Sequence, residues 1–260
     1  MESTAFRTVW MSDVHLGSRA CRIGLVLDFL RRTRCDTLYL VGDIVDLESL
    51  RGSFYWPPSH SEALRLILEK SRQGTRVVYV PGNHDEDLRA LVGAQFGNIE
   101  IARRCIHTTR AGRRMLVLHG DEFDALMKCS ALSLLFGGLA YRTLLSLNRL
   151  VHWWHDLLRR PYWSLAQHIK GKMTNALRYI DQFQRASLGA AREAGVDGVI
   201  CGHIHKAEVV ERDGLLYCND GDWVESCTAL VERASGEIEL VTWRPSVAVT
   251  PLEAALQDAA

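Results

Sequence analysis

Five short segments of the chain combine aspartate, asparagine and histidine, the residue types that bind divalent cations in mixed sites. They are Asp13-Val14-His15, Gly42-Asp43, Gly82-Asn83-His84-Asp85, His119-Gly120-Asp121 and Gly202-His203-Ile204-His205. Ions such as Mn²⁺ and Fe²⁺ accept carboxylate and imidazole ligands together, and none of the segments holds the cysteine that a thiolate site needs. Any one of these residues could be an ordinary turn or cap residue, but half of the ten histidines lie in the five segments. The set therefore predicts a site for divalent cations.

Two cations in one site would lie about 3.5 to 4 Å apart and would need a carboxylate that binds both, with further ligands from each side. Asp43 is our candidate for that shared carboxylate. A water held by such cations loses a proton near neutral pH, and the resulting hydroxide can attack phosphorus in line. The other cation and nearby positive charge stabilise the non-bridging oxygens. The predicted chemistry is hydrolysis of a phosphate ester or anhydride.

His84 directly follows the candidate ligand Asn83, and its imidazole is a candidate for protonating the leaving oxygen or binding the transferring phosphoryl group. The alternative is that His84 only positions Asn83 through a hydrogen bond. Asp85 is a candidate for orienting the His84 ring. Four further polar residues are expected chiefly to cap helices or form turns, namely Asp46, Asp121, Ser12 and Asp222. For the first two of these, support of the cation ligands is the alternative.

Each of the five segments directly follows a short apolar run of the kind that forms a buried strand. The five runs are Thr8 to Met11, Thr37 to Val41, Val77 to Val80, Met115 to Leu118 and Gly198 to Cys201. Helical patterns over Ile23 to Arg32 and Ser61 to Arg72 separate the first three runs, which predicts right-handed crossovers in a mostly parallel sheet. In such sheets ligands bind outside the carboxyl ends of the strands. We therefore expect the five segments to converge at one edge of the sheet.

The remainder of the chain divides into a helical interval and a run of short strands. The interval from 123 to 194 has long helical periodicity and is expected to form an inserted helical lid within a single domain of residues 1–260. After Gly202, tight turns predict an antiparallel meander of strands over Glu208 to Glu211, Leu215 to Cys218, Cys227 to Glu232 and Glu237 to Trp243. Two sheets packed between helices is the simplest architecture for this order of elements.

Composition is that of an ordinary globular protein and argues against several other classes. Hydrophobic residues make up 47% and charged residues 24% of the 260 residues, which fits neither disorder nor a fibre. Lys plus Arg and Asp plus Glu number 31 each, so no overall positive charge favours nucleic acid as a partner. The seven scattered cysteines form no C-x-x-C pair, and residues 1–7 show no apolar signal region. We therefore expect a cytoplasmic setting, with neither a disulfide framework nor a transmembrane helix.

The order D-x-H, G-D, G-N-H-D, H-G-D and G-H-x-H resembles the calcineurin-like metallophosphoesterase superfamily, and the blocks span residues 13 to 205. The resemblance implies an α/β fold, the four-layer αββα sandwich of the calcineurin-like phosphoesterase type, here with the inserted helical lid. His84, Asp43 and Asn83 would be the catalytic residues. The resemblance also implies two ligand sets, one of Asp13, His15, Asp43 and His205 and the other of Asp43, Asn83, His119 and His203.

Within that superfamily the chain is similar over nearly its whole length to the UDP-2,3-diacylglucosamine pyrophosphohydrolase family of lipid A synthesis. The similarity rests on residues 12–17, on the helical insertion after His119-Gly120-Asp121, and on Tyr217-Cys218-Asn219-Asp220-Gly221-Asp222-Trp223. It implies cleavage of the pyrophosphate by attack at the α-phosphorus, giving UMP and 2,3-diacylglucosamine 1-phosphate. The implied cofactors are two divalent ions, typically Mn²⁺, with Fe²⁺ or Zn²⁺ as alternatives.

The lid interval carries an apolar stripe beside aromatic and arginine side chains that suit a membrane surface, namely Trp153, Trp163, Arg159 and Arg160. Packing against the rest of the chain is the plainer interpretation of the stripe. A slot for acyl chains, or a peripheral contact with the cytoplasmic face of the inner membrane, is the alternative.

One position departs from that family's pattern. Arg commonly follows the Asn of the third block there, whereas this chain has His84, the residue usual in the wider superfamily. A related metallophosphoesterase acting on another nucleotide, a cyclic nucleotide or a phospholipid-like phosphodiester is therefore the alternative. A phosphoprotein phosphatase fits less well, because such enzymes usually place Arg-Gly after Val45-Asp46, where this chain has Leu47-Glu48. A degenerate fold serving only as a scaffold would have lost ligand residues, and all seven are present.

Overall fold

The computed structural model describes residues 4–124 and 165–244, with side chains described from residue 176 in the second range. A first sheet has seven strands in the order β12-β11-β1-β2-β3-β5-β4. Its strands are β1 (Thr4–Met11), β2 (Thr33–Val41), β3 (Arg76–Val80), β4 (Gln95–Phe96), β5 (Ile99–Ile101), β11 (Thr228–Glu232) and β12 (Ile238–Thr242). β1, β2, β3 and β5 run parallel, whereas β4, β11 and β12 pair antiparallel with their neighbours. The predicted parallel strands are confirmed.

A second sheet has five strands in the order β6-β7-β8-β10-β9. They are β6 (Cys105–Thr108), β7 (Arg114–Val117), β8 (Gly198–Cys201), β9 (Glu208–Arg212) and β10 (Leu215–Asn219). β7, β8 and β10 are parallel, and the two edge strands are antiparallel to them. The short strands β4, β5 and β6 are additions to the predicted set, because most of their residues are not buried and they lack the apolar runs that mark β7 and β8.

The described helices are α1 (Ile23–Arg32), α2 (Leu47–Gly52), α3 (Pro58–Arg72) and α5 (Leu165–Glu193), with short 3₁₀ turns η1 (Glu86–Leu91) and η2 (Asp121–Phe123). α1 has the predicted bounds. α3 begins three residues earlier than expected, because Pro58 occupies the first turn, where a missing N–H needs no partner. Each described helix is too short or too polar to cross a bilayer.

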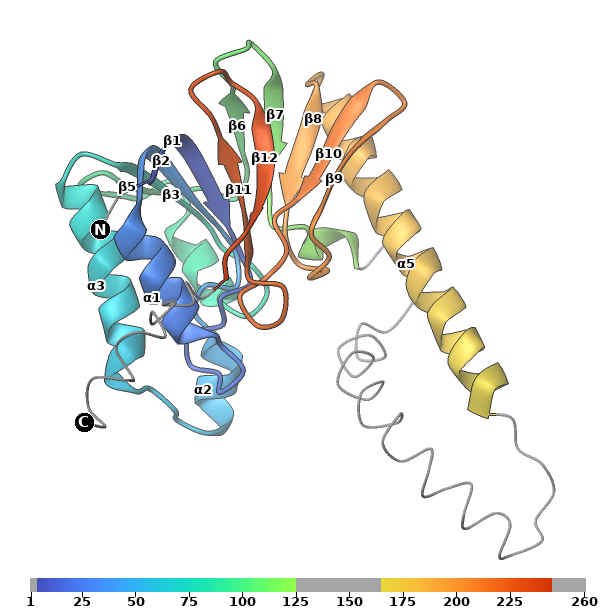
Figure 1. Cartoon of the computed structure of the whole chain (residues 1–260), viewed down its shortest axis with the longest axis horizontal. Coiled ribbons are helices and arrows are strands. Elements are labelled where there is room, and N and C mark those ends of the chain that lie inside the picture. Colours follow the sequence, from blue (N-terminus) through green and yellow to red (C-terminus); the bar gives the residue numbers. More distant parts are fainter. Residues whose placement is uncertain (1–3, 125–164, 245–260) are drawn as a thin grey trace, which may run out of the picture.

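The elements stack in four layers, with the two sheets inside and the helices outside (Figure 1). Val9 and Leu38 face the core shared with α1 and α3, whereas the adjacent Trp10 and Tyr39 face the second sheet. Successive residues of a strand point to opposite faces, and here both faces are covered. This burial explains why these strands are continuous apolar runs in the sequence. The four-layer α/β fold is thereby confirmed.

α5 forms the outer layer on the second sheet. Its side chains Tyr179, Phe183 and Leu188 pack in one hydrophobic core with residues of that sheet. The C-terminal part of the interval expected as a lid is therefore a layer of the sandwich. Residues 125–164, which include the apolar stripe with Trp153, Trp163, Arg159 and Arg160, lie outside the described residues, so the lid stays a prediction.

The predicted single meander after Gly202 is wrong in its pairing. β9 and β10 form one antiparallel hairpin in the second sheet, and β11 and β12 form another in the first. β10 pairs parallel with β8, and β11 pairs antiparallel with β1. Turn residues specify a hairpin locally, but they do not specify which sheet edge the hairpin joins.

Candidate metal centre

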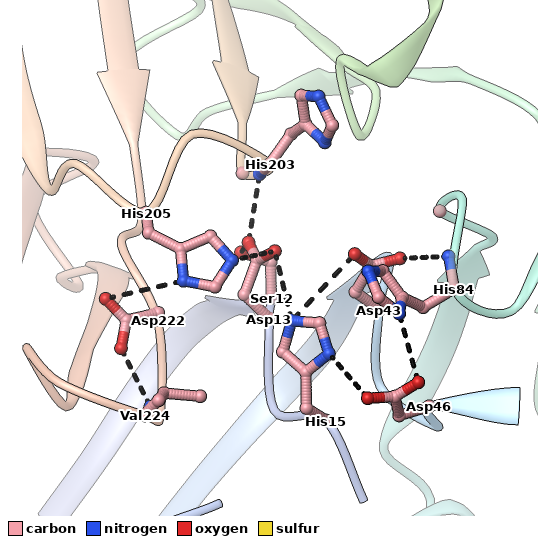
Figure 2. A network of polar contacts seen from close by, with 12 residues as sticks. Ser12, Asp13, His15, Asp43, Asp46, His84, His203, His205, Asp222 and Val224 are labelled. Carbon is pink, nitrogen blue, oxygen red and sulfur yellow. Dashed lines mark hydrogen bonds and ion pairs between the residues drawn. The ribbon is translucent and has the colours of Figure 1, made fainter. Parts of the chain in front are cut away.

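The five predicted segments meet where the two sheets adjoin. They follow β1, β2 and β3 of the first sheet and β7 and β8 of the second. Figure 2 shows Asp13, His15, Asp43 and His205 pointing toward one another from these loops. The predicted convergence of the segments is confirmed, although they gather at the ends of two sheets rather than of one.

Strained backbone accompanies this convergence. Five residues of the predicted ligand sets have a positive φ between 52° and 69°, namely Asp13, His15, Asp43, His203 and His205. This left-handed conformation costs a non-glycine residue about 1 to 2 kcal/mol. Such strain persists only where the surrounding structure fixes it, and it is concentrated at functional sites.

Two glycines allow the loops to approach each other closely. A Cβ atom on Gly82 would lie 2.2 Å from Asp43 Oδ1, and one on Gly202 would lie 2.6 Å from Asp13 Oδ2. Neither glycine has a positive φ. A side chain at either position would therefore displace a carboxylate of the site.

The ligand atoms form compact groups. Asp13 Oδ1 lies 3.2 Å from His205 Nε2 and 3.9 Å from His15 Nε2. Asp43 Oδ2 lies 3.5 Å from His119 Nε2 and 3.9 Å from His15 Nε2. In two groups, Asp13 with His15 and His205 and Asp13 with Asp43 and His119, all ligand atoms lie within 4.8 Å of one another. Each group combines carboxylate and imidazole and could hold a divalent cation.

Four atoms of the predicted ligands are buried without a hydrogen-bond partner. They are Asp13 Oδ1, His15 Nε2, Asn83 Oδ1 and His119 Nε2. Buried polar atoms in folded proteins are almost always partnered, so each exception needs an explanation. Divalent cations accept just these oxygen and imidazole donors. The residues present therefore fit the cations that the sequence predicts.

The other polar atoms of these side chains are held by the protein. His119 Nδ1 donates to the backbone oxygen of Val41 over 2.8 Å, and its Nε2 faces the centre at 3.5 Å from Asp43 Oδ2. His15 Nδ1 lies 3.5 Å from Asp46 Oδ2. Such partners fix the tautomer and the ring orientation of a metal-binding histidine.

Carboxylates and imidazoles of the centre shift each other's pKa. Burial raises the pKa of Asp43, but His119 and His15 together lower that pKa to about 2. Burial likewise raises the pKa of Asp13, and its imidazole neighbours, first His205, bring it well below its ordinary value. Against burial, Asp13 raises the pKa of His205 to about 9. A cation would compete with protons for these imidazoles, so its binding would release protons.

His84 is oriented by Asp46 and not by Asp85. Its Nδ1 lies 3.0 Å from Asp46 Oδ1 and 3.6 Å from Glu48 Oε2. Burial lowers the pKa of His84, but Asp46 and the other nearby carboxylates raise it above its ordinary value. Asp46 also caps α2 by accepting from the Ser49 N–H over 2.8 Å. Asp46 therefore caps the helix as predicted and also contacts the candidate ligand His15 and the candidate acid His84.

The expectation for Asp85 is wrong because its carboxylate is used elsewhere. It accepts hydrogen bonds from the Gly82 N–H at 2.6 Å, the Ile44 N–H at 3.0 Å and the Tyr79 hydroxyl at 2.5 Å. These bonds tie the loop after β3 to the loop after β2. Asp85 thus holds two ligand-bearing loops together.

His203 takes part in the centre differently from the other predicted ligands. Its backbone N–H donates to Asp13 Oδ2 over 2.9 Å, and its Nε2 lies 2.9 Å from Asp124 Oδ2. It belongs to none of the compact ligand groups among the described residues. Asp124, which the sequence analysis missed, is held in turn by the Tyr179 hydroxyl at 2.7 Å.

Three other polar residues make contacts that the local sequence did not predict. Asp121 pairs with Arg89 over 2.6 Å. Asp222 caps the following turn through the Val224 N–H at 2.7 Å, as predicted, and also lies 4.0 Å from His205 Nδ1. Ser12 was expected in a turn, but its hydroxyl contacts Asp13 Oδ2 at 2.5 Å. Nothing in its local sequence distinguishes Ser12 from an ordinary turn serine.

Comparisons with known proteins give one family and several distant structures. The family model described as calcineurin-like phosphoesterase matches residues 6–207. A comparison with curated proteins gives no match. Among solved structures, the chain is similar to a single mutant of Vps29 from Entamoeba histolytica, with 14% identity, 91% of this chain and 99% of that chain covered, and a TM-score of 0.42. It is also similar to Yfce, a phosphoesterase from E. coli, with 14% identity, 91% of this chain and 99% of that chain covered, and a TM-score of 0.41. These likenesses bear on neither the substrate nor the partners of this chain.

Proposed function

Because the chain belongs to the calcineurin-like phosphoesterase family, we propose that it is a two-metal hydrolase whose seven predicted ligand residues hold a pair of divalent cations. Mn²⁺ is the first candidate, with Fe²⁺ and Zn²⁺ as alternatives, since all three accept oxygen and imidazole ligands. The first set of ligands is Asp13, His15, Asp43 and His205, and the second is Asp43, Asn83, His119 and His203.

The group of four buried, unpartnered ligand atoms is the observation that carries this proposal. A buried polar atom without a partner costs about 1 to 3 kcal/mol, which a bound cation would offset. Asp43 Oδ2 lies within 3.9 Å of a histidine nitrogen from each set. This position supports Asp43 as the ligand shared by both cations.

When bound, the cations would supply the positive charge that activates water and stabilises the developing charge on the phosphate oxygens. The chain itself supplies the proton. His84 is the candidate acid, because Asp46 holds its ring and favours the protonated form. Its side chain is 20% exposed, so a substrate oxygen can reach it. The protonated ring would donate to the leaving oxygen or bind the phosphoryl group.

For the substrate we propose UDP-2,3-diacylglucosamine, cleaved to UMP and 2,3-diacylglucosamine 1-phosphate. The order of the five blocks, the helical periodicity of the sequence from 123 to 194 and the block from Tyr217 to Trp223 support this choice. The proposed partners follow from the substrate, namely a nucleotide-lipid and a peripheral contact with the membrane that contains it.

A second candidate is a phosphodiesterase for other nucleotides, cyclic nucleotides or phospholipid-like esters. His84 favours this candidate, because it stands where the nucleotide-lipid family commonly has Arg. Arg presents a fixed fork of donors to phosphate, whereas histidine provides one proton and a smaller contact.

Release of UMP from UDP-2,3-diacylglucosamine by the purified, Mn²⁺-loaded protein tests the first candidate. We expect release well above that of an Asp43→Ala control, and faster turnover than on bis-p-nitrophenyl phosphate or a cyclic nucleotide. No release above the control, together with turnover of a simpler diester, would favour the second candidate. No turnover of any ester would remove the hydrolase assignment.

A further inference from the structure

A buried acid lies behind the cation-binding face of Asp13. Asp220, in the loop after β10, has no exposed surface, and Ser12 is 1% exposed. The Ser12 hydroxyl oxygen lies 2.5 Å from Asp13 Oδ2 and 2.6 Å from Asp220 Oδ1. One serine hydroxyl therefore stands between two carboxyl groups.

Counting hydrogens limits how this row of three side chains can be bonded. A hydroxyl carries a single hydrogen and can donate to only one of two carboxylates at such distances. The second short contact therefore needs a hydrogen from a carboxyl group. Two ionised carboxylates would leave one oxygen facing another without a hydrogen between them.

The polar neighbours of the two carboxyl groups indicate that the hydrogen is on Asp220. Asp13 Oδ2 also accepts from the His203 N–H at 2.9 Å, and Asp13 Oδ1 faces His205 at 3.2 Å. Asp220 Oδ2 is also without a hydrogen-bond partner, and unlike Asp13 Oδ1 it has no histidine within ion-pair distance among the described residues. A buried carboxylate with an unpartnered oxygen is far costlier than a neutral carboxyl group. Burial also raises the pKa of Asp220 well above its ordinary value.

We propose that Asp220 is a positioning residue that stays neutral and donates to Ser12, so that Ser12 donates to Asp13 and fixes the direction of its carboxylate. This inference rests on the proposed function, in which Asp13 binds a cation. Through this row, Oδ2 of Asp13 is held by Ser12 and His203, and Oδ1 is left directed at the centre.

The loop that carries Asp220 is itself anchored. The Asp220 N–H donates to the backbone oxygen of Cys201 over 3.1 Å, and the Asp220 backbone oxygen accepts from the Thr228 hydroxyl at 2.7 Å. The Asn219 side chain accepts from the Gly221 N–H over 3.0 Å. A fixed backbone is what a positioning residue needs, since its own movement would pass to the group it orients.

Calorimetric titration of the metal-free protein with Mn²⁺ tests the proposal in three single variants and in the double variant of Ser12→Ala with Asp220→Ala. Asp220→Ala removes the donor and should raise the dissociation constant about 10- to 100-fold, the usual cost of losing a group that orients a ligand. Asp220→Asn keeps a neutral N–H donor of similar shape and should stay within about threefold of the original protein. Ser12→Ala should match Asp220→Ala. The double variant should be no worse than the weaker-binding single one, because both changes break one row.

The control is Glu232→Ala, which truncates another fully buried acid, paired with His107 and away from the centre. It should lower the unfolding temperature and leave Mn²⁺ affinity unchanged. Unchanged affinity in Asp220→Ala, or equal losses in Asp220→Asn and Asp220→Ala, would overturn the proposal. If Asp220→Ala does not fold, Ser12→Ala and Asp220→Asn decide by the same criteria.

The result separates this inference from the proposed function. An original protein that binds no Mn²⁺ would remove both. Two bound ions and phosphodiester turnover, with all three variants unchanged, would remove only the role of Asp220.

Discussion

Among the described residues, two buried clusters combine carboxylates with histidines, and they differ in how the hydrogen bonds of these groups are satisfied. In the cluster between the sheets, Glu232 accepts from the Thr8 hydroxyl and the Arg110 N–H, each over 2.7 Å, and lies 3.0 Å from His107 Nε2. The other ring nitrogen of His107 lies 3.2 Å from the Tyr39 hydroxyl. None of these atoms is among the unpartnered ones of the described residues.

The candidate metal centre has the same residue types, but several of its buried polar atoms have no hydrogen-bond partner. Four of its ligand atoms are unpartnered, and five of its predicted ligand residues have left-handed backbone. The residues of the Glu232 cluster have no positive φ. Buried acids and histidines therefore do not by themselves indicate a site. Unpartnered atoms on strained backbone, directed at a common point, do.

The largest expected difference between the two clusters is the effect of their substitutions on turnover. Asp43→Ala removes the proposed shared ligand and should lower kcat/KM on bis-p-nitrophenyl phosphate on the order of 10³-fold. Glu232→Gln should leave kcat/KM nearly unchanged. Similar losses in both variants would show that the comparison does not distinguish a functional cluster from a structural one.

Removal of the proposed acid should have the next largest effect on turnover. His84→Ala should lower kcat on the order of 10²-fold, the usual contribution of a positioned acid or base. The exposed neighbour Glu48 provides the control, and Glu48→Gln should change kcat little. A loss greater with an alkyl than with a p-nitrophenyl leaving group would indicate protonation of the leaving oxygen. Equal losses would indicate a phosphate contact, and unchanged kcat would contradict both roles.

Mn²⁺ should stabilise the folded protein by binding at the candidate metal centre and not at the Glu232 cluster. At 100 times its dissociation constant, an ion that binds only the folded state adds about 2.7 kcal/mol to the free energy of unfolding. We expect this gain in the original protein and in Glu232→Gln, measured by urea unfolding with Mn²⁺ or with chelator. Asp43→Ala should lose most of it. A gain of equal size in Asp43→Ala would place the stabilising ion elsewhere.

The fully bonded cluster should matter for stability alone. Glu232→Gln replaces a carboxylate that accepts from Thr8 and Arg110 and should lower the free energy of unfolding by about 1 to 3 kcal/mol. The calorimetric affinity for Mn²⁺ should stay that of the original protein. A weakened affinity would mean that the two clusters are coupled through the sheets.

The smallest expected effect is a change in the pH dependence of stability. Burial lowers the pKa of His107 below its ordinary value of 6.5. Below that pH the folded state therefore binds fewer protons than the unfolded state, and the free energy of unfolding falls as the pH falls. His107→Gln should reduce this slope, by at most about 1.4 kcal/mol per pH unit for one proton. Urea unfolding of both proteins between pH 7 and pH 5 measures it, and identical slopes would exclude His107 as a contributor.

Much of the fold could be predicted because the information is local. Buried strands such as β1 and β2 are apolar runs, and a polar segment with Asp or His follows each. The bounds of helix α1 follow in the same way from the periodicity of its apolar residues. Pairing is not local, so the sequence did not place the last two hairpins in different sheets.

The sequence by itself determined which residue types stand at the ends of the strands, and hence the family and its chemistry. Only the tertiary structure decided which atom of each residue faces which neighbour: Asp46 and not Asp85 at His84, Asp124 at His203, and Ser12 between Asp13 and Asp220. The physical reason is the length scale of a hydrogen bond. A motif fixes a side chain to within several ångströms, whereas donors and acceptors must meet within about 3 Å and at a suitable angle. That final precision comes from the packing of the sheets, which brings Ser12 and Asp220 into contact across 208 positions of the sequence.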